Sequence, residues 1–328
     1  MKLNNIAIIR SLCIFAIVIF HTYGYMYAAA HFPDTVSVYH KTYFWFNQCV
    51  IVNIAMPMFT VISGFLFAWL FAKGKYQEFG AFIYKKCLRL LLPFFIFGIL
   101  MMLTTGETFR PWSLLSGGFS HLWYLPALFW CFAAGWPFKK FVKNIYVQIA
   151  ILVFFLLLQT QEQFLPRIIG MHNFSCWFGW FLLGEVIATY NDSVKKMIER
   201  YHLVIPLCIP FCVQASLYPV EYGVATWYSV LGITLLAIGI LYFNWDMIGD
   251  LAKPLILFSQ YSFGVFIFHN YVGPFLISRT AKRILPLSEW AADYTIIFPI
   301  SLTILILFIS FLLSWALMKT KVGKILIG

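Results

Sequence analysis

Charged side chains are scarce in this sequence. Asp, Glu, Lys and Arg make up 11% of the 328 residues, whereas an average soluble domain carries about 25%. The apolar share is 62% and the mean hydropathy is +0.84, which exclude a soluble globular enzyme, a disordered chain and a coiled coil. An all-α polytopic membrane protein remains, because the long apolar runs do not show the short alternating segments of a transmembrane β-barrel.

Several chemical signatures are also absent. No His, Cys, Asp and Glu residues have the spacing of a metal site, and the sequence has neither a phosphate-binding loop nor a dinucleotide fingerprint. The seven cysteines include no CxxC pair, and most lie within apolar runs, where we interpret them as small apolar residues. The sequence therefore predicts no bound metal and no bound cofactor.

Acidic residues are half as common as basic ones. Asp and Glu number 12 against 23 Lys and Arg, which gives a formal net charge of +11. In a soluble protein this excess would suggest a nucleic-acid partner. Here the basic residues lie at the ends of apolar runs, which is typical of a membrane protein orienting itself in the lipid. We therefore predict contact with membrane lipids and no nucleic acid.

The apolar runs predict about ten transmembrane helices, each needing about 20 apolar residues. The connections between them leave no room for a soluble domain, so we expect one integral-membrane domain over residues 1–328. Any active site must then be built from the spans and their short loops. The expected spans are 6–28, 44–72, 87–104, 120–138, 145–161, 173–190, 203–219, 225–243, 255–278 and 294–318.

The distribution of Lys and Arg predicts that both termini are cytoplasmic. Most of the 23 basic residues fall on the side of the two termini, and cytoplasmic loops carry the excess of Lys and Arg. The cluster at 279–283 opposes this rule locally, so it is either tolerated there or faces an acidic ligand outside. The basic residues on the opposite side are Lys41, Arg110, Arg167, Arg279, Lys282 and Arg283.

Two ionisable residues lie in the first span. Arg10 and His21 are 11 positions apart, which places both side chains within about 20° of one helix face and about 16 Å apart along the axis. Ionisable groups are costly in the membrane and indicate function. The spacing fits a cation at the cytoplasmic entrance and a base at mid-depth. It equally fits an Arg that reaches the headgroups and a His bound to a carbonyl.

Four more regions carry candidate site residues. Lys85, Lys86 and Arg89 are expected at a helix start, where cations are unfavourable and an anion, either a lipid headgroup or a donor phosphate, would compensate. Glu185 is a lone carboxylate that we expect to pair with a cation, Arg10 or Arg89. The remaining candidates are His121 and Trp123 at the outer end of the fourth span, and Ser262 and His269 on one face of the ninth. Trp123 also fits an interfacial aromatic belt.

Taken in order, these segments resemble the membrane-bound acyltransferase-3 family. Arg10 and His21 match its Arg-x10-His, and Ser63-Gly64-Phe65 matches its Ser-Gly-Phe segment. Further along the chain, Lys86-Cys87-Leu88-Arg89 resembles Arg-x-x-Arg, His121-Leu122-Trp123-Tyr124-Leu125 resembles His-Leu-Trp-Phe-Leu, and Tyr261-Ser262 with His269 resembles the late Tyr-Ser then His. Lys86 departs from the pattern, because it keeps the charge of Arg without its bidentate fork.

The resemblance implies a stand-alone O-acyltransferase of the bacterial inner membrane. It implies acetyl-CoA as the acyl donor, and a lipopolysaccharide, exopolysaccharide or lipid-linked glycan as the acceptor. His21 would be catalytic, as a general base or as a covalent acyl carrier. Arg10, Lys85, Lys86 and Arg89 would bind the donor. His121, Trp123, Glu185, Ser262 and His269 would line the acceptor side or serve the structure.

Three other interpretations stay open on the sequence alone. Intramembrane Arg, His and Glu also suit a secondary transporter, although no convincing internal repeat is present. A non-catalytic component of polysaccharide export would tolerate substitution of Arg10 and His21. Transfer of succinyl rather than acetyl is the third possibility.

Overall fold

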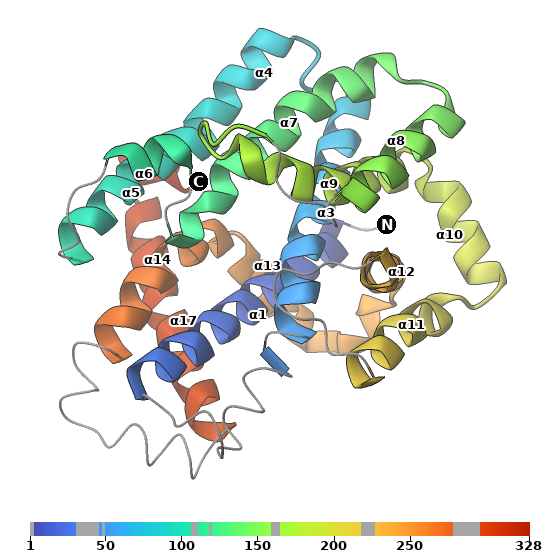
Figure 1. Ribbon diagram of the computed structural model, residues 1–328. Coiled ribbons are helices and arrows are strands. Elements are labelled where there is room, and N and C mark those ends of the chain that lie inside the picture. The colour runs from blue at the N-terminus through green and yellow to red at the C-terminus, as the bar shows by residue number, and fades with distance from the viewer. Residues whose placement is uncertain are drawn as a thin grey trace. The chain divides into compact units, whose positions relative to one another are not determined.

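The computed structural model describes residues 3–30, 46–47, 50–105, 111–117, 120–158, 165–217, 227–277 and 296–328. These residues form helices and contain no strand (Figure 1), which confirms the all-α class. Lys41, Arg110 and the basic cluster at 279–283 lie outside the described residues.

Four helical segments in the described part of the chain are long and apolar enough to cross a membrane: Leu3–Met26, Val52–Ala72, Phe79–Thr104 and Ile297–Met318. A fifth span results if Trp227–Tyr242 and Trp245–Ser259 are counted as one. Each of the ten predicted segments overlaps a helix, but several of these helices are shorter than a full span. Ten spans with cytoplasmic termini therefore stay a prediction.

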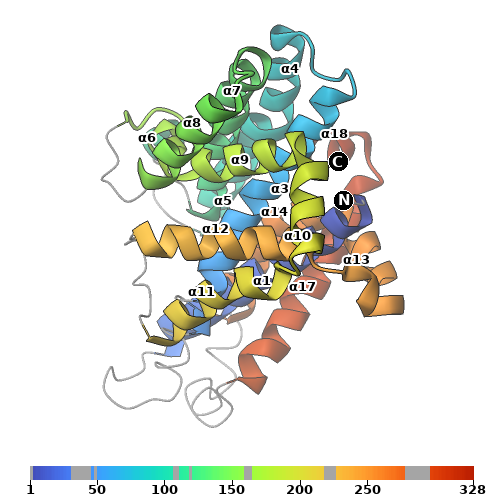
Figure 2. The same ribbon diagram turned by 90° about the vertical axis from the view of Figure 1, so that its right-hand side faces the viewer.

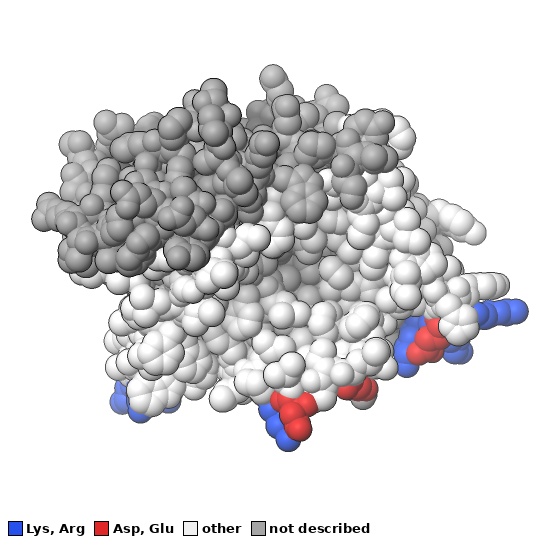
Figure 3. Space-filling model, turned by 90° about the horizontal axis from the view of Figure 1, so that it is seen from below, with Lys and Arg blue, Asp and Glu red and all other residues white. Residues whose placement is uncertain are grey.

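The surface supports a membrane protein. Large apolar side chains such as Leu103, Ile205 and Ile297 have 70%, 75% and 70% of their surface exposed. The described part of the face in Figure 3 is almost wholly uncharged. Bulk water would penalise such a surface, whereas lipid would not.

Contacts divide the chain into two compact units. Unit 1 comprises Pro57–Phe211 and Val224–Phe243, and unit 2 comprises Lys2–Met56, Cys212–Gly223 and Asn244–Gly328. Each unit combines segments that are distant in the sequence.

Unit 1 is built around the crossing of two helices, α3 (Val52–Ala72) and α9 (Phe174–Thr189). A Cβ on Gly64 would lie 1.9 Å from the carbonyl oxygen of Phe181, and one on Gly184 would lie 1.9 Å from that of Val61. Only glycine allows the backbones to approach this closely, which gives the Gly of the Ser63-Gly64-Phe65 segment a structural reason.

Two other helices of unit 1, α7 (Tyr124–Phe141) and α8 (Ile145–Leu158), pack against α9, and Figure 2 shows them beside it. In chain order the described elements of unit 1 besides α3 and α9 are α4 (Phe79–Lys86), the π-helical turn η2 (Cys87–Leu91), α5 (Leu92–Thr105), α6 (Pro111–Ser116), the 3-10 turn η3 (Ser120–Trp123), α7, α8, the 3-10 turn η4 (Met171–Asn173), α10 (Asn191–Arg200), most of α11 (Val204–Leu217) and α12 (Trp227–Tyr242).

Unit 2 is organised by the first helix, α1 (Leu3–Ala30), which packs against α13 (Ala252–Ser259), α14 (Ser262–Pro274) and α17 (Ile297–Met318). Its remaining described helices are η5 (Trp245–Leu251) and α18 (Lys321–Leu326). The contacts of α1 with α14 bring together residues from the two ends of the chain, and these contacts hold the candidate site.

Candidate active site

Arg10 and Ser262 form the first polar contact between α1 and α14. The Nε of Arg10 donates a hydrogen bond to Ser262 Oγ at 2.7 Å. Ser262 Oγ donates in turn to the carbonyl oxygen of Ser259 at 2.7 Å, and Ser262 has no exposed surface. One residue along α1, Ser11 Oγ donates to the carbonyl oxygen of Leu255 at 2.6 Å. The guanidinium of Arg10 is therefore held in one orientation by the start of α14.

His21 and His269 form the second contact. Their ring centroids lie 5.0 Å apart, with 46° between the ring planes. On the same helix as His21, Tyr25 stacks its ring against the imidazole, with centroids 5.9 Å apart and 23° between planes. His269 has no exposed surface. Two imidazoles and a phenol thus meet inside unit 2.

The two contacts follow the same order along both helices. Arg10 precedes His21 on α1, and their partners Ser262 and His269 follow in that order on α14, so the two helices run in the same direction. Both α1 side chains therefore point to α14, as the helical spacing predicts. Ser262 contacts Arg10 and His269 contacts His21. Ser262 and His269 therefore lie on the same face of α14, the face that packs against α1.

One hydrogen bond defines the tautomer of His269. Its Nδ1 lies 3.2 Å from the carbonyl oxygen of Val265. Because a carbonyl oxygen only accepts, Nδ1 carries the proton and Nε2 is the basic nitrogen. An imidazole fixed in this way is suited to orient a neighbouring base or to exchange a proton with it.

Tyr25 and Gly273 are site residues that the sequence reasoning did not single out. A Cβ on Gly273 would lie 2.5 Å from Cε2 of Tyr25, so α14 comes close to the ring that stacks on His21 only because residue 273 is glycine. The four-residue spacing of His21 and Tyr25 was a usable signal, since such pairs meet on a helix. The contact with Gly273 leaves no local trace in the sequence.

The basic cluster of Lys85, Lys86 and Arg89 belongs to unit 1 and is arranged differently from our expectation. The helix begins at Phe79 and continues through η2 into α5, so these cations lie within a helical run and not at its start. The argument that an N-terminus needs a compensating anion is therefore wrong. Lys85 and Arg89 are exposed.

Lys86 lies against aromatic rings. Its Nζ is 3.5 Å from the ring centroid of Phe132 and 5.5 Å from those of Tyr76 and Phe82. Rings attract a cation through their negative faces. Lys86 therefore joins α4 to α7, with its ammonium on the face of the Phe132 ring.

His121 and Trp123 also belong to unit 1. His121 is 5% exposed in the turn η3, and Trp123 packs on Trp177 with centroids 5.5 Å apart. The next residue, Tyr124, shares a hydrogen bond of 2.9 Å with Thr60 of α3. The segment thus fastens the start of α7 to α9 and α3.

Glu185 lies at the contact of α9 with α7. It is 1% exposed, and neither carboxylate oxygen has a hydrogen-bond partner among the described residues. The charge of Lys139 on α7 acts on this carboxylate, and the pairing with Arg10 or Arg89 stays a prediction. Lys139 Nζ donates to Thr189 Oγ1, which donates to the backbone carbonyl of Glu185 at 2.6 Å.

A comparison with protein-family models matches residues 3–319 to an acyltransferase domain. No curated protein and no solved structure matches the chain. The matched range contains every residue of the contacts described above.

Proposed function

Since the chain belongs to the acyltransferase-3 family, we propose that it transfers an acetyl group from cytoplasmic acetyl-CoA to a hydroxyl of a cell-surface or lipid-linked polysaccharide. In this proposal it is a multi-pass protein of the bacterial inner membrane with about ten spans and cytoplasmic termini. The observation that carries the proposal is the pairing of α1 with α14, which places an oriented cation, Arg10, and the histidine pair His21–His269 along one contact between two helices.

The chemistry requires a base, because a sugar hydroxyl is a poor nucleophile while it keeps its proton. His21 accepts the hydroxyl proton as the oxygen attacks the thioester carbonyl. The carbon–sulfur bond then breaks, the new ester remains on the sugar, and the CoA sulfur leaves as thiolate and takes the proton from His21. His269 orients His21. The covalent alternative, in which the acyl group first bonds to His21, uses the same geometry.

Arg10 serves the donor in this mechanism. Its Nε is held by Ser262, and the planar fork of its terminal nitrogens matches a phosphate or a carboxylate. The helical rise places it about 16 Å from His21 along α1, which suits a phosphate-bearing head at one end and a thioester at the other. Lys85 and Arg89 supply further charge for the donor, and Lys86 supports them by packing.

The test compares surface glycans from cells that carry the gene with those from a deletion strain, by mass spectrometry before and after mild alkali. An alkali-labile group with the mass of acetyl, present only with the gene, is the expected result and identifies the acceptor. An alkali-labile group with the mass of succinyl would mean that the donor carries succinyl and not acetyl. No difference on any glycan would contradict the proposal and favour a transporter or an export component.

A further inference from the structure

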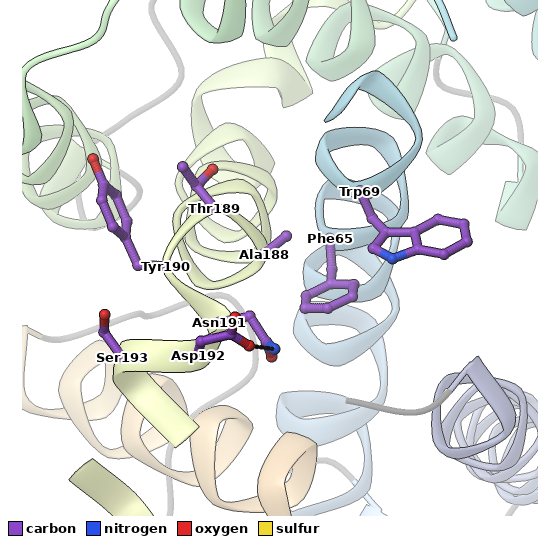
Figure 4. Close-up of a pocket in the computed structure, with 8 residues that line it drawn as sticks. All are labelled: Phe65, Trp69, Ala188, Thr189, Tyr190, Asn191, Asp192 and Ser193. Carbon is purple, nitrogen blue, oxygen red and sulfur yellow. Dashed lines mark hydrogen bonds between the residues drawn. The ribbon is translucent and has the colours of Figure 1, made fainter. Parts of the chain in front are cut away.

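A pocket of about 480 Å³ lies in unit 1 where α3 faces the junction of α9 and α10. Pockets that bind small molecules have volumes of about 300–1,000 Å³. Figure 4 shows Phe65 of α3 opposite Asn191 and Asp192 of α10. The lining residues are Phe65, Trp69, Ala188, Thr189, Tyr190, Asn191, Asp192 and Ser193.

One wall of the pocket is aromatic and has a cation beside it. Trp69 and Phe65 are one helical turn apart on α3. The Nζ of Lys73 lies 3.9 Å from the centroid of the Trp69 ring. An indole offers a face on which a planar base stacks, and the adjacent ammonium suits a phosphate attached to that base through a sugar.

The opposite wall presents an amide held by two contacts. Asn191 Nδ2 donates to Asp192 Oδ1 at 3.1 Å, and Tyr242 Oη donates to Asn191 Oδ1 at 3.2 Å. An amide has two N–H donors and two acceptor positions on oxygen, so each atom keeps the capacity for one more bond. An Asn amide recognises adenine by accepting from the N6 amine and donating to N7.

The location of the pocket favours the donor over the acceptor. Asp192 is the charged residue of the lining. Basic residues lie further along the same elements: Lys73 and Lys75 follow α3, and α10 carries Lys196 and Lys195, which pairs with Glu199 at 3.5 Å. All four lysines belong to the side that the sequence predicts to be cytoplasmic, where acetyl-CoA is made. A polysaccharide acceptor would approach from the other side.

We propose that this pocket binds the adenine nucleotide of the acyl-CoA donor, with the base on Trp69, its N6 and N7 edge on Asn191 and a ribose hydroxyl on the Asp192 carboxylate. The proposal rests on the proposed function, since that function supplies the donor. None of Arg10, Lys85 and Arg89 is among the residues that line this pocket.

The first experiment measures CoA binding to the full chain in detergent, for wild type, Trp69→Leu and the matched control Trp112→Leu. Trp112 is 78% exposed and lies outside the pocket. We expect Trp69→Leu to bind CoA roughly tenfold more weakly, because stacking of one base on an aromatic ring contributes about 1–3 kcal/mol. Acetyl-pantetheine, which lacks the nucleotide, should bind wild type and Trp69→Leu equally.

A second variant tests whether Asn191 recognises the N6 and N7 edge of the adenine base. Asn191→Ala should weaken CoA binding, and it should remove any preference for CoA over 1,N6-etheno-CoA, in which the N6 edge is blocked. Wild type should prefer CoA by about tenfold, since a bidentate contact discriminates by about 1–3 kcal/mol. Asn191 is only partly buried, so this variant keeps the test open if Trp69→Leu fails to fold.

The outcomes separate the two proposals. If wild type binds CoA and all three variants bind it equally, the nucleotide lies elsewhere and only the pocket assignment is wrong. If Trp69→Leu binds CoA normally but loses acetyl transfer, the pocket serves the acceptor and the assignment is again wrong. If wild type binds neither CoA nor acetyl-pantetheine, the proposed function fails together with it.

Discussion

The ionisable candidate residues of the two units differ in their surroundings. In unit 2, Arg10 and His21 of α1 each meet a polar residue of α14, Ser262 and His269. In unit 1, the ammonium of Lys86 lies among aromatic rings, and the Glu185 carboxylate oxygens have no hydrogen-bond partner among the described residues. Polar groups that meet across helices can hold a substrate or exchange a proton. Charged groups enclosed by apolar surroundings mainly affect packing and stability. The comparison is the reason why the proposed chemistry is placed on α1 and α14.

The largest effect should come from the histidine pair. We expect His21→Asn to lower the rate of the proposed acetyl transfer by about 100-fold to 10,000-fold, the range that a general base contributes. The measurement is acetyl on the glycan, normalised to the amount of protein in the membrane. His202→Asn is the matched control, because His202 is exposed in unit 1, and it should transfer normally. Normal transfer by His21→Asn would mean that the histidine pair of unit 2 does not carry the chemistry, and the contrast drawn between the two units would fail.

The crossing of α3 and α9 should give the largest effect on stability. Gly64→Ala places a Cβ 1.9 Å from a backbone oxygen that cannot rotate away. Overpacking of this kind costs about 1–3 kcal/mol and occasionally more, so we expect a loss of about 3 kcal/mol in thermal unfolding of the purified chain. Gly80→Ala is the control, since no atom lies within 4 Å of its Cβ position, and it should unfold no earlier than wild type.

These variants also show what the sequence could and could not predict. The helices and the shared face of Arg10 and His21 follow from local periodicity, because turn geometry is the same in any helix. Ser262, the partner of Arg10, is 252 positions away in the sequence. No local sequence pattern can predict a contact over that separation. The resemblance brought Ser262 and His269 into one motif, but only the packing of α1 on α14 assigns each to its partner.

The errors in unit 1 have a similar origin. The sequence predicts a span at 87–104 with Lys85, Lys86 and Arg89 at its helix start, yet the helix begins at Phe79. The rings that surround Lys86 come from residues 76, 82 and 132, which are brought together only by folding. A charged residue within an apolar run therefore indicates a free-energy cost of burial. The tertiary structure decides which neighbouring side chains offset that cost.

A third variant acts on the histidine pair from a distance. Gly273→Ala places a Cβ 2.5 Å from the Tyr25 ring, so the ring must move away from His21. We expect the transfer rate to fall about tenfold while the KM for acetyl-CoA stays unchanged, because a small displacement of a catalytic group has large effects on rate. Tyr25→Phe keeps the stacked ring and should stay close to wild type. A normal rate in Gly273→Ala would show that Tyr25 does not position His21.

The cationic cluster should separate into two roles. Removing the charge in Lys86→Met should lower the free energy of unfolding by about 1 kcal/mol, since a cation on an aromatic face contributes about 0.5–2 kcal/mol. The KM for acetyl-CoA should not change. Arg89→Met should do the reverse, raising this KM with little effect on unfolding, because Arg89 is exposed. If Lys86→Met raised the KM as Arg89→Met does, Lys86 would bind the donor despite its aromatic neighbours.

The smallest effect should come from Glu185, and it tests the comparison most directly. Glu185→Gln keeps the shape of the side chain and removes the charge. Because the carboxylate oxygens accept no hydrogen bond from the described residues, the substitution gives up only the interaction with Lys139. It also removes the cost of burying a charge. We expect the free energy of unfolding to change by less than about 1 kcal/mol, or to rise, with transfer unaffected. Lost transfer in a chain that unfolds normally would mean that this carboxylate takes part in the reaction. Unit 1 would then contribute chemistry without a polar partner of the kind that His21 has in His269.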